Sequence, residues 1–106
     1  MNDTSPILEA QGLGRARLLL FQDGIRIERK RVQTDIQLPS INDIQFKKAA
    51  FRRSYIEFSF VNSVEKKGVL VYFHDKTGIR FRKKHLPAFE AIKDAIENYK
   101  NTGHLS

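Results

Sequence analysis

The sequence predicts a mainly β domain closed by one C-terminal helix, and three observations lead to this prediction. Apolar side chains recur at every second position between residues 7 and 82, which is typical of half-buried antiparallel strands. Turn-forming residues such as Asp23-Gly24 separate the alternating runs. After residue 85 the apolar spacing changes to three and four residues, which is typical of an amphipathic helix. The 106 residues fit a single domain.

Turn chemistry divides the alternating region into seven predicted strands. Asp23-Gly24 predicts a tight hairpin, and residues 74–78 predict another with Gly78 in the left-handed conformation. Residues 62–68 are interpreted as a longer polar connection. Most phenylalanines fall on the inward face and are expected in the core, whereas Tyr55 and Tyr72 are surface candidates. The predicted strands are residues 7–21 (bent at Gly12 and Gly14), 24–30, 33–38, 41–49, 54–61, 68–74 and 78–82.

The C-terminal segment predicts an amphipathic helix over about residues 86–101. Pro87 suits its first turn, and Gly103 is a plausible stop. The apolar stripe must pack on the sheets, so we expect the helix to cover one open end of the β structure. One domain over residues 7–102 is predicted, with flexible ends at 1–6 and 103–106. The stripe consists of Leu86, Phe89, Ile92, Ile96 and Tyr99.

Seven short antiparallel strands followed by one helix is the order of a pleckstrin-homology-like (PH-like) domain. Three segments also resemble a bacterial family of PH-like domains of unknown function: Gly24-Ile25-Arg26-Ile27, residues 41–49, and Tyr55-Ile56-Glu57-Phe58. The resemblance implies a seven-stranded antiparallel sandwich or barrel capped by the helix. It also implies a binding role, and it supplies no catalytic residue. The family's domain often precedes a short helical tail, which this sequence does not show.

The amino-acid composition excludes several classes of functional site. The chain has no cysteine, so disulfides, thiolate metal sites and a cysteine nucleophile are excluded. The three histidines, at 74, 85 and 104, are scattered, and we find no nucleophile motif or metal-ligand spacing. We therefore predict a protein that is not an enzyme and uses no cofactor. The net charge is +7, and residues 1–85 carry all of the excess, which favours anionic partners.

Basic residues gather in two candidate binding clusters, although solvated strand faces would explain them equally well. The first flanks the predicted first hairpin, where eukaryotic PH domains hold phosphoinositides; it contains Arg15, Arg17, Arg26, Arg29, Lys30 and Arg31. The second could dock an apolar side chain within a collar of bases; it contains Lys47, Lys48, Phe51, Arg52 and Arg53. The alternative for Phe51 is that it folds back over the sheet edge.

These features lead to one functional hypothesis and one alternative. We expect a non-catalytic interaction module that binds an acidic protein segment or anionic lipid headgroups through basic loops or a strand edge. The alternative is a nucleic-acid-binding protein that uses the same basic surface. No signal peptide or membrane-spanning run is evident, so we expect a cytoplasmic protein with at most peripheral membrane contact. Homo-oligomers through strand edges are a further possibility.

Overall fold

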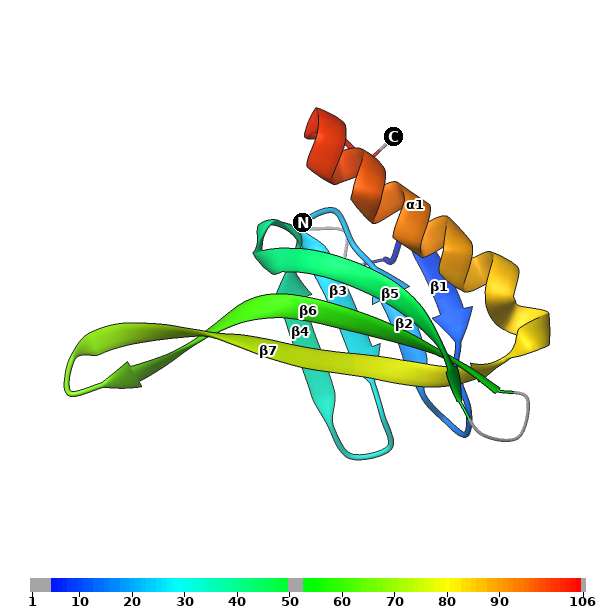
Figure 1. Cartoon of the computed structure of the whole chain (residues 1–106), viewed down its shortest axis with the longest axis horizontal. Helices are drawn as coiled ribbons and strands as arrows, with labels where there is room; N and C mark the ends of the chain where they lie inside the picture. The colour runs from blue at the N-terminus through cyan, green and yellow to red at the C-terminus, as the bar shows by residue number, and fades with distance from the viewer. Residues whose placement is uncertain (1–4, 50–52, 106) are drawn as a thin grey trace.

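The computed structural model of the chain describes residues 5–49 and 53–105, which form two antiparallel sheets and one long helix (Figure 1). The first sheet has the strand order β1 (Leu8–Gln11), β2 (Arg17–Leu20), β3 (Gly24–Glu28) and β4 (Gln33–Gln37). The second has the order β5 (Ile41–Ala49), β6 (Arg53–Lys66) and β7 (Val69–Arg82). Short 3-10 turns, η1 (Leu38–Ser40) and η2 (Lys83–His85), precede β5 and the helix α1 (Leu86–Thr102). The mainly β prediction with one C-terminal helix is confirmed.

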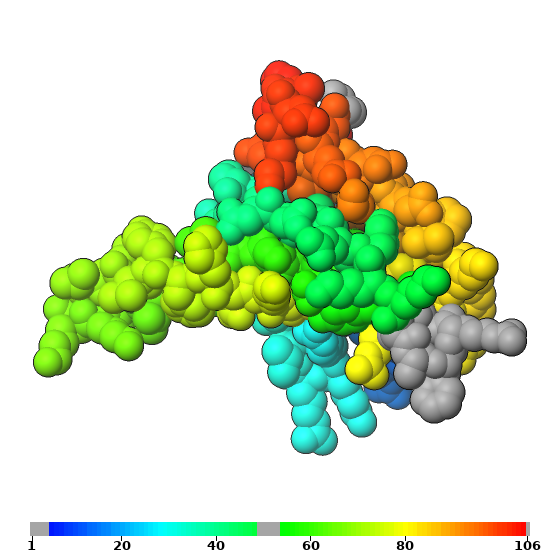
Figure 2. Space-filling view, in the orientation of Figure 1, coloured from blue at the N-terminus to red at the C-terminus, as the bar shows by residue number. Residues whose placement is uncertain are grey.

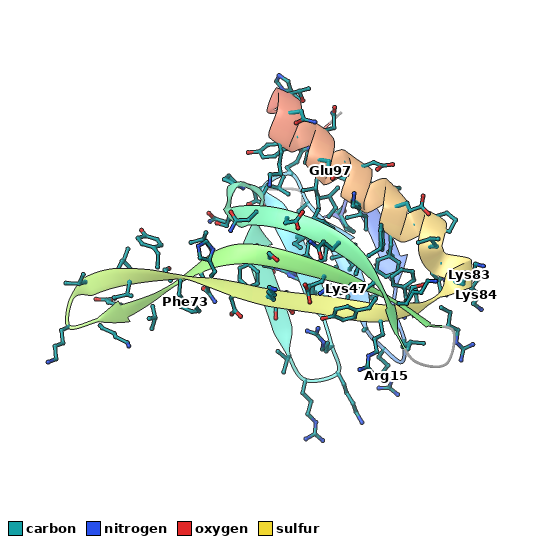
Figure 3. The ribbon with its side chains drawn as sticks, in the orientation of Figure 1. Arg15, Lys47, Phe73, Lys83, Lys84 and Glu97 are labelled. Carbon is teal, nitrogen blue, oxygen red and sulfur yellow. The ribbon has the colours of Figure 1, made fainter. Side chains whose placement is uncertain are left out.

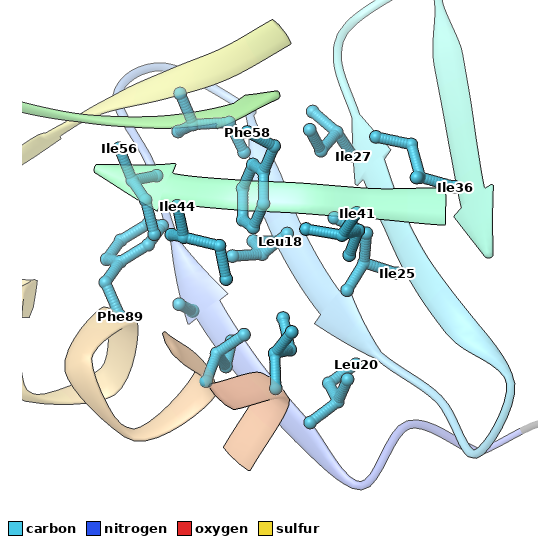
Figure 4. Close-up of a cluster of buried hydrophobic side chains, with 14 of the residues drawn as sticks. Leu18, Leu20, Ile25, Ile27, Ile36, Ile41, Ile44, Ile56, Phe58 and Phe89 are labelled. Atoms are coloured by element: carbon cyan, nitrogen blue, oxygen red, sulfur yellow. The ribbon is translucent and has the colours of Figure 1, made fainter. Parts of the chain in front are cut away.

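The core lies between the two sheets and the helix (Figure 4). The alternating apolar positions of the strands point into it, so Leu18, Ile27 and Phe58 are fully buried. The helix contributes Phe89, whose ring stacks on Phe81 with the ring centroids 4.1 Å apart. Gly103 ends the helix at a φ of 81° and donates its N–H to the Tyr99 carbonyl, as the sequence predicted.

Two loops fasten the first sheet to β7. The Leu13 N–H of the β1–β2 loop donates to the Arg80 carbonyl over 2.8 Å. The Arg29 guanidinium of the β3–β4 turn donates to the Gly78 carbonyl. Both loops therefore lie at the same end of the body and hold a defined position relative to β7.

The predicted first strand over residues 7–21 is wrong, because this segment forms the two strands β1 and β2. A tight turn joins them, with the Gly12 N–H donating to the Ala16 carbonyl and Gly14 at a φ of 64°. Glycine adopts this left-handed conformation without the steric cost of a side chain. The two glycines that indicated a bend thus mark a complete reversal of the chain.

The predicted hairpin at residues 74–78 is also wrong, because residues 69–82 form one continuous strand. Gly78 lies inside β7 opposite Glu57. A Cβ added there would lie 2.1 Å from the Ile56 carbonyl oxygen and 2.5 Å from the Tyr55 ring. Glycine is therefore required for close packing and not for a turn. The chain instead reverses at Lys67 and Gly68, which have φ values of 51° and 79°.

The strands β6 and β7 continue beyond the body as a two-stranded arm (Figures 1 and 2). The strand β5 begins at Ile41, opposite Phe60, so residues 61–74 have no third strand beside them. We call residues 61–74 the arm. They make the molecule 45 Å long against 31 and 28 Å in the other directions. The predicted polar connection at residues 62–68 is wrong, since all of it belongs to this arm and only Lys67 and Gly68 lie outside the strands. No helix in the described part of the chain is both long and apolar enough to cross a membrane.

Candidate functional site

A basic concavity lies on the body where the β1–β2 and β3–β4 loops come together. It has a volume of about 450 Å³ and is open to solvent. The β3–β4 turn is closed by a hydrogen bond from the Arg29 N–H to the Val32 carbonyl over 2.8 Å. Figure 3 shows Arg15 at the edge of the body toward which this turn projects. The concavity is lined by Arg15, Arg17, Glu28, Arg29, Lys30, Arg31, Val32 and Gln33.

Arg17 is neutralised within the concavity. Its guanidinium donates to Glu28, with the Nε–Oε1 distance at 3.0 Å, and to Glu9, also over 3.0 Å. The hydrogen bonds to Glu28 and the charges of both carboxylates raise the pKa of Arg17 above its usual range. Glu9 and Glu28 lie directly across from Leu19 and Arg17 on the neighbouring strands. Arg17 is therefore paired with two carboxylates inside the concavity and is not free to hold an anion.

Arg26 does not join the concavity, contrary to the prediction that placed it in the first cluster. Its Nε donates to the Asp35 Oδ1 over 2.8 Å, and its guanidinium lies 5.3 Å from the centre of the Phe21 ring. The hydrogen bond from Arg26 lowers the pKa of Asp35 below its usual 3.8. Cross-strand pairing with β4 and stacking on Phe21 therefore hold Arg26 on the outer face of the sheet.

The remaining basic residues of the concavity keep their charge available. Arg15, Lys30 and Arg31 are exposed, and within residues 5–49 and 53–105 none of them has a carboxylate partner. Among the same described residues, the Arg29 guanidinium donates to the neutral Gly78 carbonyl, which leaves its positive charge uncompensated. Four cations from two loops thus surround the paired Arg17 and Glu28.

The second predicted cluster is only partly described. Lys47 pairs with Glu57 over 3.0 Å, and Lys48 is exposed at the end of β5. Phe51 and Arg52, together with the side chain of Arg53, lie outside the described residues. The proposed apolar docking of Phe51 is therefore untested, and Lys47 is engaged within the sheet.

Sequence reasoning missed Val32 as part of the site. Its side chain is 59% exposed at the tip of the β3–β4 turn, beside Lys30 and Arg31. One signal was present, because Val32 is the single apolar residue in the otherwise polar stretch 30–34. Exposure of a β-branched residue at a turn tip depends on how far the turn projects, which the sequence pattern does not give.

The described residues suit anion binding without an evident catalytic group. They include no cluster of three or more His, Cys, Asp or Glu side chains that could hold a metal ion. Of the histidines, His74 lies on β7 with its Nδ1 3.3 Å from the Asn42 amide nitrogen, remote from the concavity. The chemistry available in the concavity is that of guanidinium and ammonium groups, which bind phosphate and carboxylate oxygens.

Comparisons with family models, curated proteins and solved structures found no match to this chain.

Proposed function

We propose that the protein is a non-catalytic, PH-like interaction module that binds anionic lipid headgroups at the basic concavity. One observation carries this proposal: Arg15, Arg29, Lys30 and Arg31 come from two separate loops and meet around one open depression. Arginine presents a planar fork that matches phosphate oxygens, and three of these four residues are arginines. The order of four strands, three strands and one helix also supports a PH-like fold.

A membrane surface fits the shape of this end better than a long acidic peptide does. The β3–β4 turn projects from the body and carries exposed Val32 directly after Lys30 and Arg31, which is how a peripheral protein combines apolar and electrostatic contacts. Each base close to an anionic surface contributes about 1 kcal/mol, so four bases give about 4 kcal/mol, equivalent to a Kd of roughly 1 mM. We therefore expect weak, reversible binding that depends strongly on salt.

The nucleic-acid alternative receives less support from the positions of the aromatic side chains. Binding of single strands uses exposed aromatic rings beside the basic groups. Tyr72 is exposed, but it lies on the arm, away from the concavity. Tyr55 is half-buried, and its ring lies over the backbone of Gly78. Among the described residues, the lining of the concavity therefore includes bases but no aromatic side chain.

Flotation with phosphatidylcholine vesicles, with and without phosphatidylserine, tests the proposal at low and physiological salt. We expect binding to the anionic vesicles only, weakened by salt. The variant Arg15→Glu/Arg31→Glu should abolish this binding. The control Lys67→Glu/Lys76→Glu makes the same change in net charge on exposed residues away from the concavity and should retain it.

Three results would reject the assignment. Equal loss in both variants would show a non-specific charge effect. Absence of flotation at low salt, with retention on a polyglutamate column, would favour an acidic protein segment. Absence of flotation with a mobility shift of DNA or RNA, weakened by salt, would favour the nucleic-acid alternative.

A further inference from the structure

The arm carries large apolar side chains that are exposed to solvent. Apart from Ile7 and Val32, the large exposed apolar side chains of the described residues all lie on it: Val64, Val69, Leu70, Val71, Tyr72 and Phe73. A two-stranded hairpin is marginally stable alone in water, and exposed apolar patches mark contact surfaces. The arm therefore needs a partner surface that the single chain does not supply.

Four of the six exposed apolar side chains of the arm lie on one face, and Leu70 and Tyr72 lie on the other. Directly opposed residues in the two strands point to the same face of the hairpin. The residues two positions before and after them in each strand point to that face as well. The pairs Lys66–Val69, Val64–Val71 and Asn62–Phe73 therefore form consecutive rows on one face, which we call the apolar arm face. The next row on this face is Phe60–Asp75, where the body begins. The other face carries Ser63 and Glu65 between its apolar residues.

The charges at the two ends of this face have opposite signs. Lys66 lies at the tip, and exposed Asp75 lies at the base on the same face. A second copy that lies antiparallel on the first brings the Lys66 of each chain toward the Asp75 of the other. The rows Val64–Val71 and Asn62–Phe73 then cover one another. The face is thus complementary to itself in both polarity and charge, which is the requirement of a two-fold interface.

The position of the charges argues against insertion of the arm into a membrane. Glu65, Lys66 and Lys67 form the tip, so three charged groups would have to enter the apolar layer before Val71 or Phe73 could reach it. A face that is apolar along its length and charged at both ends suits lateral packing on a protein surface.

We propose that two copies of this chain form a two-fold dimer by packing their apolar arm faces together antiparallel. The exposed surface of the four apolar side chains, with the stems of Asn62 and Lys66, gives on the order of 1,000 Å² for both arms together, at the lower limit of specific interfaces. An interface of this size is expected to be weak, so dimerisation should depend on protein concentration. The basic concavity is not part of the interface, so this proposal is independent of lipid binding.

Sedimentation equilibrium over a wide range of protein concentration tests the proposal. The expected mass rises from that of the 12.3 kDa chain toward twice this value. Val71→Ser should prevent dimerisation. The control variant is Leu70→Ser, which changes the neighbouring residue on the opposite face of the arm. Leu70 is 57% exposed and Val71 is 42% exposed. The control should leave the dimer intact.

Charge reversal tests the antiparallel arrangement. Lys66→Glu and Asp75→Lys should each weaken the dimer at least tenfold, and the double variant should restore it. A monomer at every concentration would overturn the proposal. So would equal losses from Val71→Ser and Leu70→Ser, which would indicate pairing through strand edges. Failure of the double variant to recover would overturn the antiparallel arrangement.

Discussion

The strands β6 and β7 have two halves with the same alternating pattern and opposite surroundings. In the body half, Phe58 and Ile79 point toward the first sheet and are buried. In the arm half, Val71 and Phe73 continue the same face and are exposed. Alternation therefore determines which residues share a face, but burial requires an opposing sheet. The difference separates what local sequence specifies from what tertiary packing adds.

The largest expected effect comes from truncating equivalent side chains in the two halves. Phe58→Ala should lower the free energy of unfolding by about 3–5 kcal/mol, because it empties a fully enclosed core position. Phe73→Ala should lower it by less, about 1 kcal/mol, because Phe73 is 42% exposed in the monomer and its loss leaves no enclosed cavity. Urea unfolding monitored by circular dichroism at low protein concentration measures both. Similar losses would mean that the arm is covered by the body in solution.

Gly78 in the body half and Gly68 in the arm turn allow the same comparison for the backbone. Gly78→Ala should cost about 2–3 kcal/mol, since its Cβ would meet the Ile56 carbonyl and the Tyr55 ring at distances no real contact shows. Gly68→Ala, in the arm turn, should cost only about 1–2 kcal/mol, because nothing lies near its Cβ and only its φ of 79° is unfavourable. Thermal unfolding of both variants measures the difference. A Gly78→Ala variant as stable as Gly68→Ala would show that the β6 backbone and the Tyr55 ring do not approach Gly78 this closely.

The sequence predicted the local features of the fold and missed those that depend on distant contacts. The helix and a tight hairpin between β2 and β3 follow from neighbouring residues, and both are confirmed. The turn itself differs from the predicted Asp23-Gly24 pair, because Gly24 already belongs to β3 and pairs with Gln37. Gly78 was misread as a turn residue because the Tyr55 ring that requires a glycine there is far away in the sequence. Asn62 and Ser63 resemble a loop, yet they pair with Phe73 and Tyr72 in a regular ladder.

The basic site was predictable to a similar extent. The loop position of Arg31 follows from the predicted strands on either side of it, whereas Arg15 was predicted within one strand and reaches the concavity through the unpredicted turn between β1 and β2. The pairing of Arg26 with Asp35 depends on the register between β3 and β4, which is fixed only once the turn at residues 29–32 is known. Composition shows how many bases a strand carries, and register decides which of them are already neutralised.

The smallest expected effect concerns ion pairs, which the body has and the described part of the arm lacks. The bond from Arg26 lowers the pKa of Asp35 below 3.8, so Asp35 adds stability above about that pH. This contribution is lost as the pH falls through the lower folded-state pKa. Because both side chains of the pair are exposed to solvent, this contribution is small.

An NMR titration of the Asp35 carboxyl carbon tests this ion pair directly. In Arg26→Gln the pKa of Asp35 should rise toward 3.8, because the charged donor is removed while a polar side chain remains. The stability advantage of the wild type over this variant should shrink in acid, where protonated Asp35 no longer attracts the guanidinium. Lys66→Gln, which removes a positive charge from the arm tip, should leave the Asp35 titration unchanged. A common shift in both variants would mean that Asp35 responds to the net charge of the molecule, and the cross-strand pair would then contribute nothing to holding the body together.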